Sequence, residues 1–386
     1  MDKPNRFRLH PDVRAALFLA GTIAFFAVFA IPMGIGNAIN TLMNTAYRIL
    51  METVFYIMAI AVIAGALSSV LTEFGVVNLL NKLLSPLMRP LFGMPGASAL
   101  GVVSTYLSDN PAILTLADDK KFRRYFKAYQ IPALTNLGTA FGMGLIVTSF
   151  MLGLVGKMSR GVGLAAFCGN VGAVVGAIVS TRLMLLFMKK AYGPDAPALE
   201  EPAQEDAQTV CSKHRGLLHV LDALMEGGKK GVDLGLAIIP GVLIICSVVL
   251  MLTNGKPAEG YSGAAYEGIA LLPKLADALG FVLKPLFGFS SAEALAVPVT
   301  ALGSAGAALG LIPKFAREGL IGPNDLAVFT AICMCWSGYL STHVSMMEVL
   351  GCSEHTGKAI LCHTLGGLCA GVAAHWLFML LFRLLI

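Results

Sequence analysis

The sequence predicts an all-α polytopic membrane protein built from two inverted repeats, each with a re-entrant helical hairpin and broken helices. Three observations lead to this fold class: the composition, the long apolar stretches and an internal repeat. Of the 386 residues, 56% are hydrophobic and 13% are charged, about half the charged share of a typical soluble domain. So few charges cannot cover a water-facing surface, whereas helices surrounded by lipid do not need them.

The net charge of +5 indicates cytoplasmic loops that face anionic lipid. Because no basic patch with interleaved aromatic residues accompanies it, we expect the lipid bilayer and no nucleic acid as a partner. The eight cysteines show no paired CxxC spacing. We therefore predict reduced, buried thiols and neither a disulfide framework nor a zinc site.

Seven uncharged apolar stretches are long enough to cross a membrane, which takes roughly 20 helical residues for ~30 Å. The first follows a basic amino terminus, as in a signal peptide, but its apolar run exceeds the ~7–15 residues of such a segment, so we expect a retained helix. The stretches are residues 15–35, 54–72, 128–156, 161–181, 234–255, 326–347 and 359–382.

An internal repeat becomes visible when the sequence is shifted by 195 positions. The shift places Arg89-Pro90-Leu91-Phe92-Gly93 on Lys284-Pro285-Leu286-Phe287-Gly288, and identities continue without a gap to Leu116 on Leu311. The same register pairs Thr135 with Thr330. Since apolar composition alone would produce fewer identities, we interpret the two segments as copies of one unit.

Each copy contains a short apolar piece, residues 96–107 or 291–302. A helix of this length rises about 18 Å, too little to cross the bilayer. A helix breaker follows each piece, Ser108-Asp109-Asn110-Pro111 or Gly303-Ser304-Ala305-Gly306, and then a second short apolar piece. We predict a re-entrant hairpin in each copy, because non-helical backbone at membrane depth must be covered by protein or a water-filled cavity.

The predicted organisation has four parts. Prolines and acidic residues alternate between Pro194 and Asp206, which predicts a solvated linker between the two halves. The parts are an amino-terminal transmembrane helix with an outer loop (1–47), a first repeat (48–190), a cytoplasmic linker with an amphipathic segment (191–228) and a second repeat (229–386).

Basic residues set the predicted orientation, with the amino terminus inside and the carboxyl terminus outside. This choice makes residues 36–47 an outer loop and places the basic cluster at 120–127 in the cytoplasm, as the positive-inside rule requires. An odd number of crossings then separates the two hairpins, so they enter from opposite faces. The repeats are therefore predicted to be inverted, which permits alternating access around a midplane site.

The first hairpin tip holds the strongest site candidates, Ser108, Asp109 and Asn110, just before a helix that begins at Pro111. Free amide groups at a helix start can hold anionic or polar groups. A polar side chain at membrane depth is costly and usually has a function. We favour contact with a substrate or, for Asp109, a coupling ion; the alternative is that Asp109 only caps the helix.

Further substrate-binding candidates lie in the third span and in the second repeat. Thr135 and Asn136 precede glycines at which the helix could unwind, although helix packing through small residues would explain this pattern equally well. The second repeat supplies hydroxyls and an aromatic surface, with packing as the alternative role; the candidates are Ser304, Trp336, Ser337 and Tyr339.

His343 and Glu348 are candidates for proton coupling, with an ordinary packing histidine as the alternative. His363 and His375 are twelve residues apart and fall on different helix faces, so we expect no metal site. No P-loop, HExxH or GxSxG motif occurs. We therefore predict no enzyme, no catalytic residue and no cofactor, with Na⁺ or H⁺ as the candidate coupling ion.

The paired Pro-Leu-Phe-Gly hairpins and the segment 129–138 (YQIPALTNLG) resemble the bacterial nucleoside-recognition, or Gate-domain, membrane proteins. Over nearly the whole chain the sequence is similar to a fusion of the two partner proteins related to spore maturation proteins A and B. Gate domains are similar to the hairpin units of concentrative nucleoside transporters and to the membrane part of the ferrous-iron permease of the Feo system. The resemblance implies a solute permease.

We therefore hypothesise a secondary transporter for a small polar metabolite, such as a nucleoside, an amino acid or a dipeptide, with a midplane site formed by the two hairpins. The alternative is a non-transporting membrane scaffold or channel-like subunit in envelope or spore-wall assembly. Polar groups at both hairpins favour transport. We expect a multi-pass protein of the bacterial cytoplasmic (inner) membrane and leave open whether it forms a homo-oligomer.

Cysteine accessibility tests the inverted arrangement. In a background without native cysteines, a cysteine at Lys121 and a cysteine at Lys314 are expected to react with a membrane-impermeant maleimide from opposite sides, because the hairpins enter from opposite faces. Labelling of both positions from the same side would contradict the inverted repeats.

Overall fold

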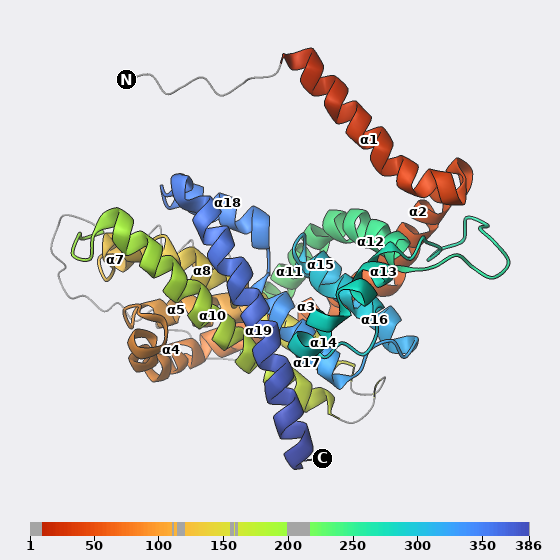
Figure 1. The fold of residues 1–386 in the computed structure, drawn as a ribbon. Helices are drawn as coiled ribbons and strands as arrows, with labels where there is room; N and C mark the ends of the chain where they lie inside the picture. Colours follow the sequence, from red (N-terminus) through yellow and green to blue (C-terminus); the bar gives the residue numbers. More distant parts are fainter. Residues whose placement is uncertain are drawn as a thin grey trace.

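The computed structural model describes residues 10–109, 112–113, 120–154, 158, 161–198 and 217–385. These residues are mainly helical, which confirms the all-α prediction (Figure 1). The helices are α1 (Pro11–Met33), α2 (Ile35–Ile49), α3 (Phe55–Glu73), α4 (Val76–Leu87), α5 (Ser98–Leu107), α7 (Lys120–Arg123), α8 (Ala133–Thr139), α9 (Gly144–Leu152), α10 (Val162–Tyr192), α11 (Leu217–Gly241), α12 (Ser247–Thr253), α13 (Leu271–Ala278), α14 (Gly280–Phe287), α15 (Ala296–Ala301), α16 (Ala305–Arg317), α17 (Pro323–Cys335), α18 (Tyr339–Val349) and α19 (Thr356–Leu385).

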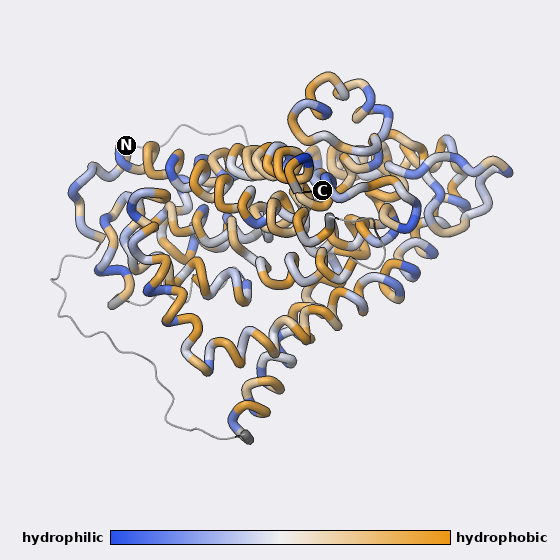
Figure 2. Tube along the Cα trace, turned by 90° about the horizontal axis from the view of Figure 1, so that it is seen from below, coloured by the Kyte–Doolittle hydropathy of each residue, from blue (hydrophilic) through white to orange (hydrophobic). Residues whose placement is uncertain are grey.

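Single π-helical turns join α2 to α3, follow α4 and join α11 to α12, so that these helices continue into longer segments. In the described part of the chain, six segments are long and apolar enough to cross a membrane. Their outward faces are apolar: Phe18 and Ile31 of α1, for example, are 79% and 84% exposed. Figure 2 shows that apolar residues prevail along most of the helices. The six segments are Pro11–Met33, Ile35–Glu73, Ala128–Leu152, Val162–Tyr192, His219–Thr253 and Ser353–Leu384.

The outer loop predicted at residues 36–47 is wrong, because these residues belong to α2. Ile35, Ile39 and Met43 recur at helical spacing on an exposed face, while Thr41 and Thr45 are buried on the other face. Gly34, with φ of 81°, separates α1 from α2. The chain therefore turns at one glycine rather than through a loop.

Residues 326–347 do not form the single spanning helix that the sequence predicts. They divide into α17 and α18, and the break lies at Trp336, Ser337 and Gly338, where Gly338 has φ of 64°. The third span is divided in the same way into α8 and α9, with φ of 56° at Met143. A left-handed conformation interrupts the helical hydrogen bonds, and it is costly for a residue with a side chain such as Met143.

The backbone confirms the repeat of 195 residues. Gly338 follows Met143 by this interval, and Gly288, with φ of 61°, follows Gly93, with φ of 72°. The long helices α10 and α19 are also equivalent under the shift. Left-handed residues at matching positions show that both copies turn at the same points.

The equivalent helices α10 and α19 pack against each other in antiparallel directions. A β-carbon added at Gly172 would lie 2.5 Å from the Ala370 carbonyl oxygen, and one added at Gly176 would lie 2.6 Å from that of Gly366. Contacts nearer the C-terminus of α10 are therefore made with residues nearer the N-terminus of α19. Because equivalent helices run in opposite directions, the two repeats are inverted.

A second antiparallel pair is formed by α3 and α11. A β-carbon at Gly227 would lie 2.2 Å from the Gly65 carbonyl oxygen, and one at Gly231 would lie 2.4 Å from that of Ala61. Such close backbone approach depends on the absence of side chains at the contact. This pair forms one wall of the candidate site described below.

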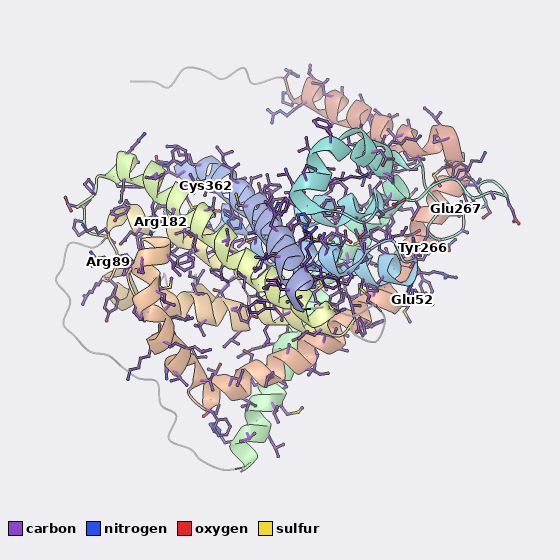
Figure 3. The ribbon with its side chains drawn as sticks, turned by 60° about the horizontal axis from the view of Figure 1, so that its bottom comes forward. Glu52, Arg89, Arg182, Tyr266, Glu267 and Cys362 are labelled. Atoms are coloured by element: carbon purple, nitrogen blue, oxygen red, sulfur yellow. The ribbon has the colours of Figure 1, made fainter. Side chains whose placement is uncertain are left out.

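Side chains hold the Pro-Leu-Phe-Gly turn of each copy. In the first copy, Gln130 Nε2 donates to the Gly93 carbonyl at 3.1 Å and Arg182 Nε donates to the Leu91 carbonyl at 2.9 Å. In the second copy, Asn324 Nδ2 donates to the Gly288 carbonyl at 2.9 Å. Figure 3 shows Arg182 on the same side of the molecule as Arg89. The guanidinium group of Arg182 in the fourth span thus donates hydrogen bonds to carbonyls of this turn.

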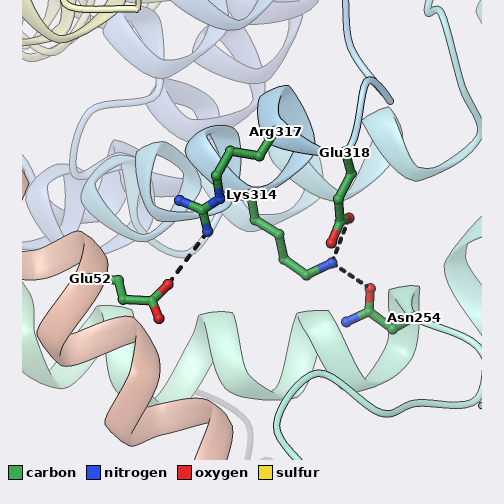
Figure 4. Close-up of polar contacts among 5 residues, drawn as sticks. All are labelled: Glu52, Asn254, Lys314, Arg317 and Glu318. Carbon is green, nitrogen blue, oxygen red and sulfur yellow. Dashed lines mark hydrogen bonds and ion pairs between the residues drawn. The ribbon is translucent and has the colours of Figure 1, made fainter. Parts of the chain in front are cut away.

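The second hairpin, formed by α15 and α16, is tied to neighbouring elements by charged groups (Figure 4). Lys314 Nζ donates to Asn254 Oδ1 at 3.1 Å and pairs with Glu318 Oε2 at 2.7 Å, while Arg317 pairs with Glu52 Oε2 at 3.4 Å. Lys314 is buried and the side chain of Arg317 is 53% exposed. Arg317 is therefore a more accessible labelling position than Lys314.

The start of the predicted linker docks on the first repeat. The Ala128 amide donates to the Ala196 carbonyl at 2.8 Å, and Lys127 Nζ pairs with Asp195 at 2.9 Å. These contacts and the bond from the Ala198 amide to the Phe126 carbonyl hold the described start of the predicted linker, residues 194–198, against the first repeat. The rest of the proline-rich segment, residues 199–216, lies outside the described residues.

The contact between α10 and α19 predicts a sharp difference between two glycines of α10. Gly172→Leu is expected to lower the melting temperature markedly, because overpacking costs about 1–3 kcal/mol or more. Gly163→Leu is the matched control, since Gly163 is exposed and an added β-carbon there meets nothing within 4 Å. Thermal unfolding of both variants in the same detergent is the measurement. Equal melting temperatures would show that this helix contact does not limit stability.

Candidate functional site

A half-open cavity of about 710 Å³ lies beside the tip of the first hairpin, between α3, α5 and α11. Its volume is within the range of ligand pockets, about 300–1,000 Å³. Polar and apolar residues line the cavity in equal number. The polar ones are Ser68, Ser69, Thr72, Glu73, Ser104, Ser108, Asp109, Glu226 and Lys230, and the others are Ala61, Gly65, Val77, Leu107, Ala112, Ile146, Ala223, Gly231 and Leu234.

Hydroxyl groups line two walls of this cavity at helical spacing. Ser68 and Thr72 lie one turn apart on α3, and Ser104 and Ser108 lie one turn apart at the end of α5. The Thr72 and Ser108 hydroxyls donate to carbonyls four residues earlier, at 2.9 Å and 2.6 Å. Their oxygens can still accept hydrogen bonds. The cavity therefore offers several acceptors to a polar ligand.

Charged groups lie around the hydroxyls. Glu73 Oε1 is 2.6 Å from His219 Nε2, and Lys230 Nζ is 2.8 Å from Glu226 Oε1. The Lys230 and Glu226 side chains are 66% and 69% exposed, so the protein does not enclose this ion pair. With Asp109 at the hairpin tip, three carboxylates and one ammonium group line the cavity. This charge balance favours a ligand that carries a positive charge or hydrogen-bond donors.

The hairpin arm is held in place by a polar contact with two other helices. Tyr106 of α5 donates to Asn170 Oδ1 of α10 at 2.9 Å, and Asn170 Nδ2 donates to Thr148 Oγ1 of α9 at 2.9 Å. Gly144 at the start of α9 makes room for the Tyr106 ring, because a β-carbon there would lie 2.2 Å from it. The tip is thus positioned next to the break between α8 and α9.

A second polar cluster is fully buried between α8, α10, α17, α18 and α19. Asn136 Nδ2 donates to Ser180 Oγ at 2.8 Å and to the Ala359 carbonyl at 2.9 Å. Ser180 Oγ lies 2.9 Å from His363 Nδ1, and His363 Nε2 contacts the Cys335 carbonyl. All three side chains have an exposed fraction of 0%.

Aromatic residues surround this buried cluster. Trp336 Nε1 donates to the His363 carbonyl at 3.3 Å, and the Tyr339 hydroxyl bonds to that of Thr364. The ring of His343 lies 4.5 Å from that of His363, measured between centroids. The cluster therefore ties the break between α17 and α18 to α19.

The structure divides the predicted site residues into separate groups. Ser108 and Asp109 line the cavity. Thr135, Asn136, Trp336, Ser337, Tyr339 and His343 are all buried in or beside the second polar cluster. Thr135 donates to Met347 Sδ at 3.4 Å. Ser304 caps α16 by accepting from the Ala307 amide at 3.2 Å. Glu348 is exposed, and Asn110 lies outside the described residues.

Several residues of the cavity and of the buried cluster were not predicted from the sequence. Ser180 and His363 are central to the buried cluster, and Ser68, Thr72 and Lys230 line the cavity. Ser180 and His363 were recognisable as polar residues inside apolar spans, a pattern that usually signals a partner or a function. Among the described residues, no three His, Cys, Asp or Glu side chains are grouped to hold a metal ion.

Comparisons with known proteins concern the fold. No family model matches the sequence. An uncharacterised protein of Alkalihalophilus pseudofirmus is 25% identical over 282 residues, which are 69% of this chain and 59% of that protein. The chain thus spans less than two thirds of this relative's length.

Solved structures of CNTnw, a concentrative nucleoside transporter, share the architecture. A CNTnw variant in an outward-facing state has a TM-score of 0.52 and 17% identity, over 98% of this chain and 93% of that one. CNTnw in an inward-facing substrate-bound state has a TM-score of 0.51 and 16% identity, over 97% and 93%. The chain is therefore a helical multi-pass membrane protein with the fold of this transporter.

Proposed function

We propose that the protein is a secondary transporter for a small polar metabolite, and that the cavity beside the first hairpin tip binds this solute. The cavity carries the proposal: it is large enough for such a solute, is lined by hydroxyls and carboxylates, and lies at the interrupted backbone of the hairpin. Polar groups of this kind within a membrane protein usually mark a solute pathway.

The fold supports the proposal because it suits alternating access. CNTnw has been solved in outward-facing, inward-facing and intermediate states. In this chain, the inverted repeats and the breaks between α8 and α9 and between α17 and α18 supply the symmetric elements that such a mechanism uses. We expect the chain to move between two such states.

The chemistry of the cavity favours a solute with several hydrogen-bond donors. Three carboxylates and five hydroxyl groups accept hydrogen bonds from hydroxyl, amide or ammonium groups. A nucleoside, an amino acid and a dipeptide all carry such donors. The predicted ligand residues of the buried cluster, such as Asn136 and Trp336, would reach the solute only in another conformation.

The scaffold alternative is less well supported, since a scaffold has no need for a polar cavity at membrane depth. The finer resemblance to Gate-domain and spore maturation proteins, and the location in a bacterial cytoplasmic membrane, stay predictions. Proteoliposomes loaded with unlabelled solute and supplied with the labelled form (uridine, serine or glycyl-alanine) test transport directly by counterflow. Counterflow above that of empty liposomes is expected for at least one solute, and none for any would argue for the scaffold.

Asp109→Asn is expected to weaken binding of the transported solute about tenfold, because hydrogen bonds to charged groups contribute about 1.5–3 kcal/mol. The change keeps the size of the side chain and its ability to cap a helix, so the melting temperature without solute should change little. Solute-induced thermal shift and counterflow, measured in parallel, give the affinity and the transport rate.

Asp277→Asn is the matched control, since Asp277 is exposed on α13 and does not line the cavity. It should retain wild-type affinity. A folded Asp109→Asn protein with wild-type affinity and transport would remove this carboxylate from the binding site.

A further inference from the structure

The hydrogen-bond partners within the buried cluster determine which atoms carry its protons. Asn136 Nδ2 can only donate, so Ser180 accepts from it and retains its own hydroxyl proton for His363 Nδ1. The carbonyl of Cys335 can only accept, so His363 carries its proton on Nε2. Both ring nitrogens of His363 are thus satisfied in the neutral imidazole.

His343 differs from His363 in this respect. Its Nδ1 lies 2.6 Å from the Tyr339 carbonyl, which only accepts, so the proton of the neutral ring is on Nδ1. The remaining nitrogen, Nε2, is then an acceptor, and it has no hydrogen-bond partner among the described residues. With an exposed fraction of 0%, this lone pair is also shielded from water.

A buried acceptor without a donor is costly and calls for an explanation. His343 does not line the cavity beside the first hairpin. A solute bound in that cavity therefore does not reach Nε2 in this conformation. The smallest species that satisfies a basic imidazole lone pair is a proton, and imidazole is the side chain best suited to bind one near neutral pH.

We propose that His343 is a proton-binding site, and that proton binding there is coupled to the conformational change of the transporter. The coupling rests on the transport function proposed above. The binding step adds H⁺ to Nε2 and gives an imidazolium with N–H on both nitrogens; no other bond changes.

The surroundings of His343 explain how a proton would act. The titratable rings in contact with it are Tyr339 of its own helix and His363 of α19. The neighbouring helix α8 has no titratable side chain, and Glu348 at the far end of α18 is exposed.

The carboxylate of Glu354 pairs with His355 at 3.3 Å, and no ion pair to His343 occurs among the described residues. An unpaired buried charge is costly. A protonated His343 would therefore disfavour this conformation and favour one in which α18 has left α19. A ligand that binds two conformations with different affinities shifts their equilibrium, which is what coupling requires.

Trp336 provides a readout that does not depend on transport. It is one of two tryptophans and donates to the His363 carbonyl, next to the histidine pair. The other, Trp376, is replaced by phenylalanine, because its ring lies 5.1 Å from that of His375. In this background, Trp336 emission is expected to change with pH in a single titration.

His343→Asn is the test variant, since an asparagine amide can still donate to the Tyr339 carbonyl but does not titrate. His375→Asn is the control, because His375 Nδ1 already bonds to Asn324 Oδ1 at 2.7 Å. The titration of Trp336 should vanish in His343→Asn and persist in His375→Asn. A titration that persists unchanged in His343→Asn would overturn the proton-binding site.

Coupling is measured in proteoliposomes with uridine, serine or glycyl-alanine, whichever shows counterflow, and with the dye pyranine inside to report internal pH. Two rates are compared: solute accumulation driven by a pH gradient, and counterflow. The first divided by the second should fall at least tenfold in His343→Asn and remain at the wild-type value in His375→Asn. Wild-type accumulation that ignores the pH gradient would overturn the coupling. Absence of counterflow in the wild type would refute transport instead, while the fluorescence titration would still decide whether His343 binds a proton.

Discussion

The antiparallel contact between α10 and α19 supports the rest of the architecture. These helices meet through Gly172, Gly176 and Gly366, where a side chain on either helix would collide with backbone of the other. Because each helix belongs to a different repeat, their contact joins the two copies and sets them in opposite orientations. Ser180 and His363 lie on the same pair of helices and are brought to 2.9 Å by it.

The need to satisfy polar backbone at membrane depth explains where the interrupted helices lie. Both breaks, after α8 and after α17, are buried in protein rather than exposed to lipid, as this constraint demands. The turns at Gly93 and Gly288 have their carbonyls bonded to Gln130 and Asn324. The two copies thus use different side chains for the same backbone task, which is why the symmetry is clear in the backbone and weaker in the sequence.

The polar residues of the membrane region form two separate groups, the cavity beside the first hairpin and the buried cluster, and these differ in their exposure. The cavity beside the first hairpin is open, lined by hydroxyls and carboxylates, and suited to a solute. The cluster around His363 is closed, and apart from Asn136 Oδ1 and His343 Nε2 its polar atoms have partners. The proposed coupling assigns solute binding to the open cavity and proton binding to the closed cluster.

Composition and periodicity, which depend only on neighbouring residues, were enough to predict the all-α class, the repeat of 195 residues and the short hairpin arms. They also placed Ser108 and Asp109 at a polar tip. The sequence could not show that residues 326–347 would break at Gly338, because that stretch is long and uncharged and a glycine is compatible with a continuous helix.

The partners of each polar residue were decided only by the tertiary structure. Ser68 and Lys230 became cavity walls because α3 and α11 approach through Gly65 and Gly227, and His363 met His343 because α18 packs on α19. An apolar helix carries little information about which of its faces meets which neighbour. The physical reason is that lipid and protein interior are similarly apolar, so only shape and hydrogen bonding select the contact.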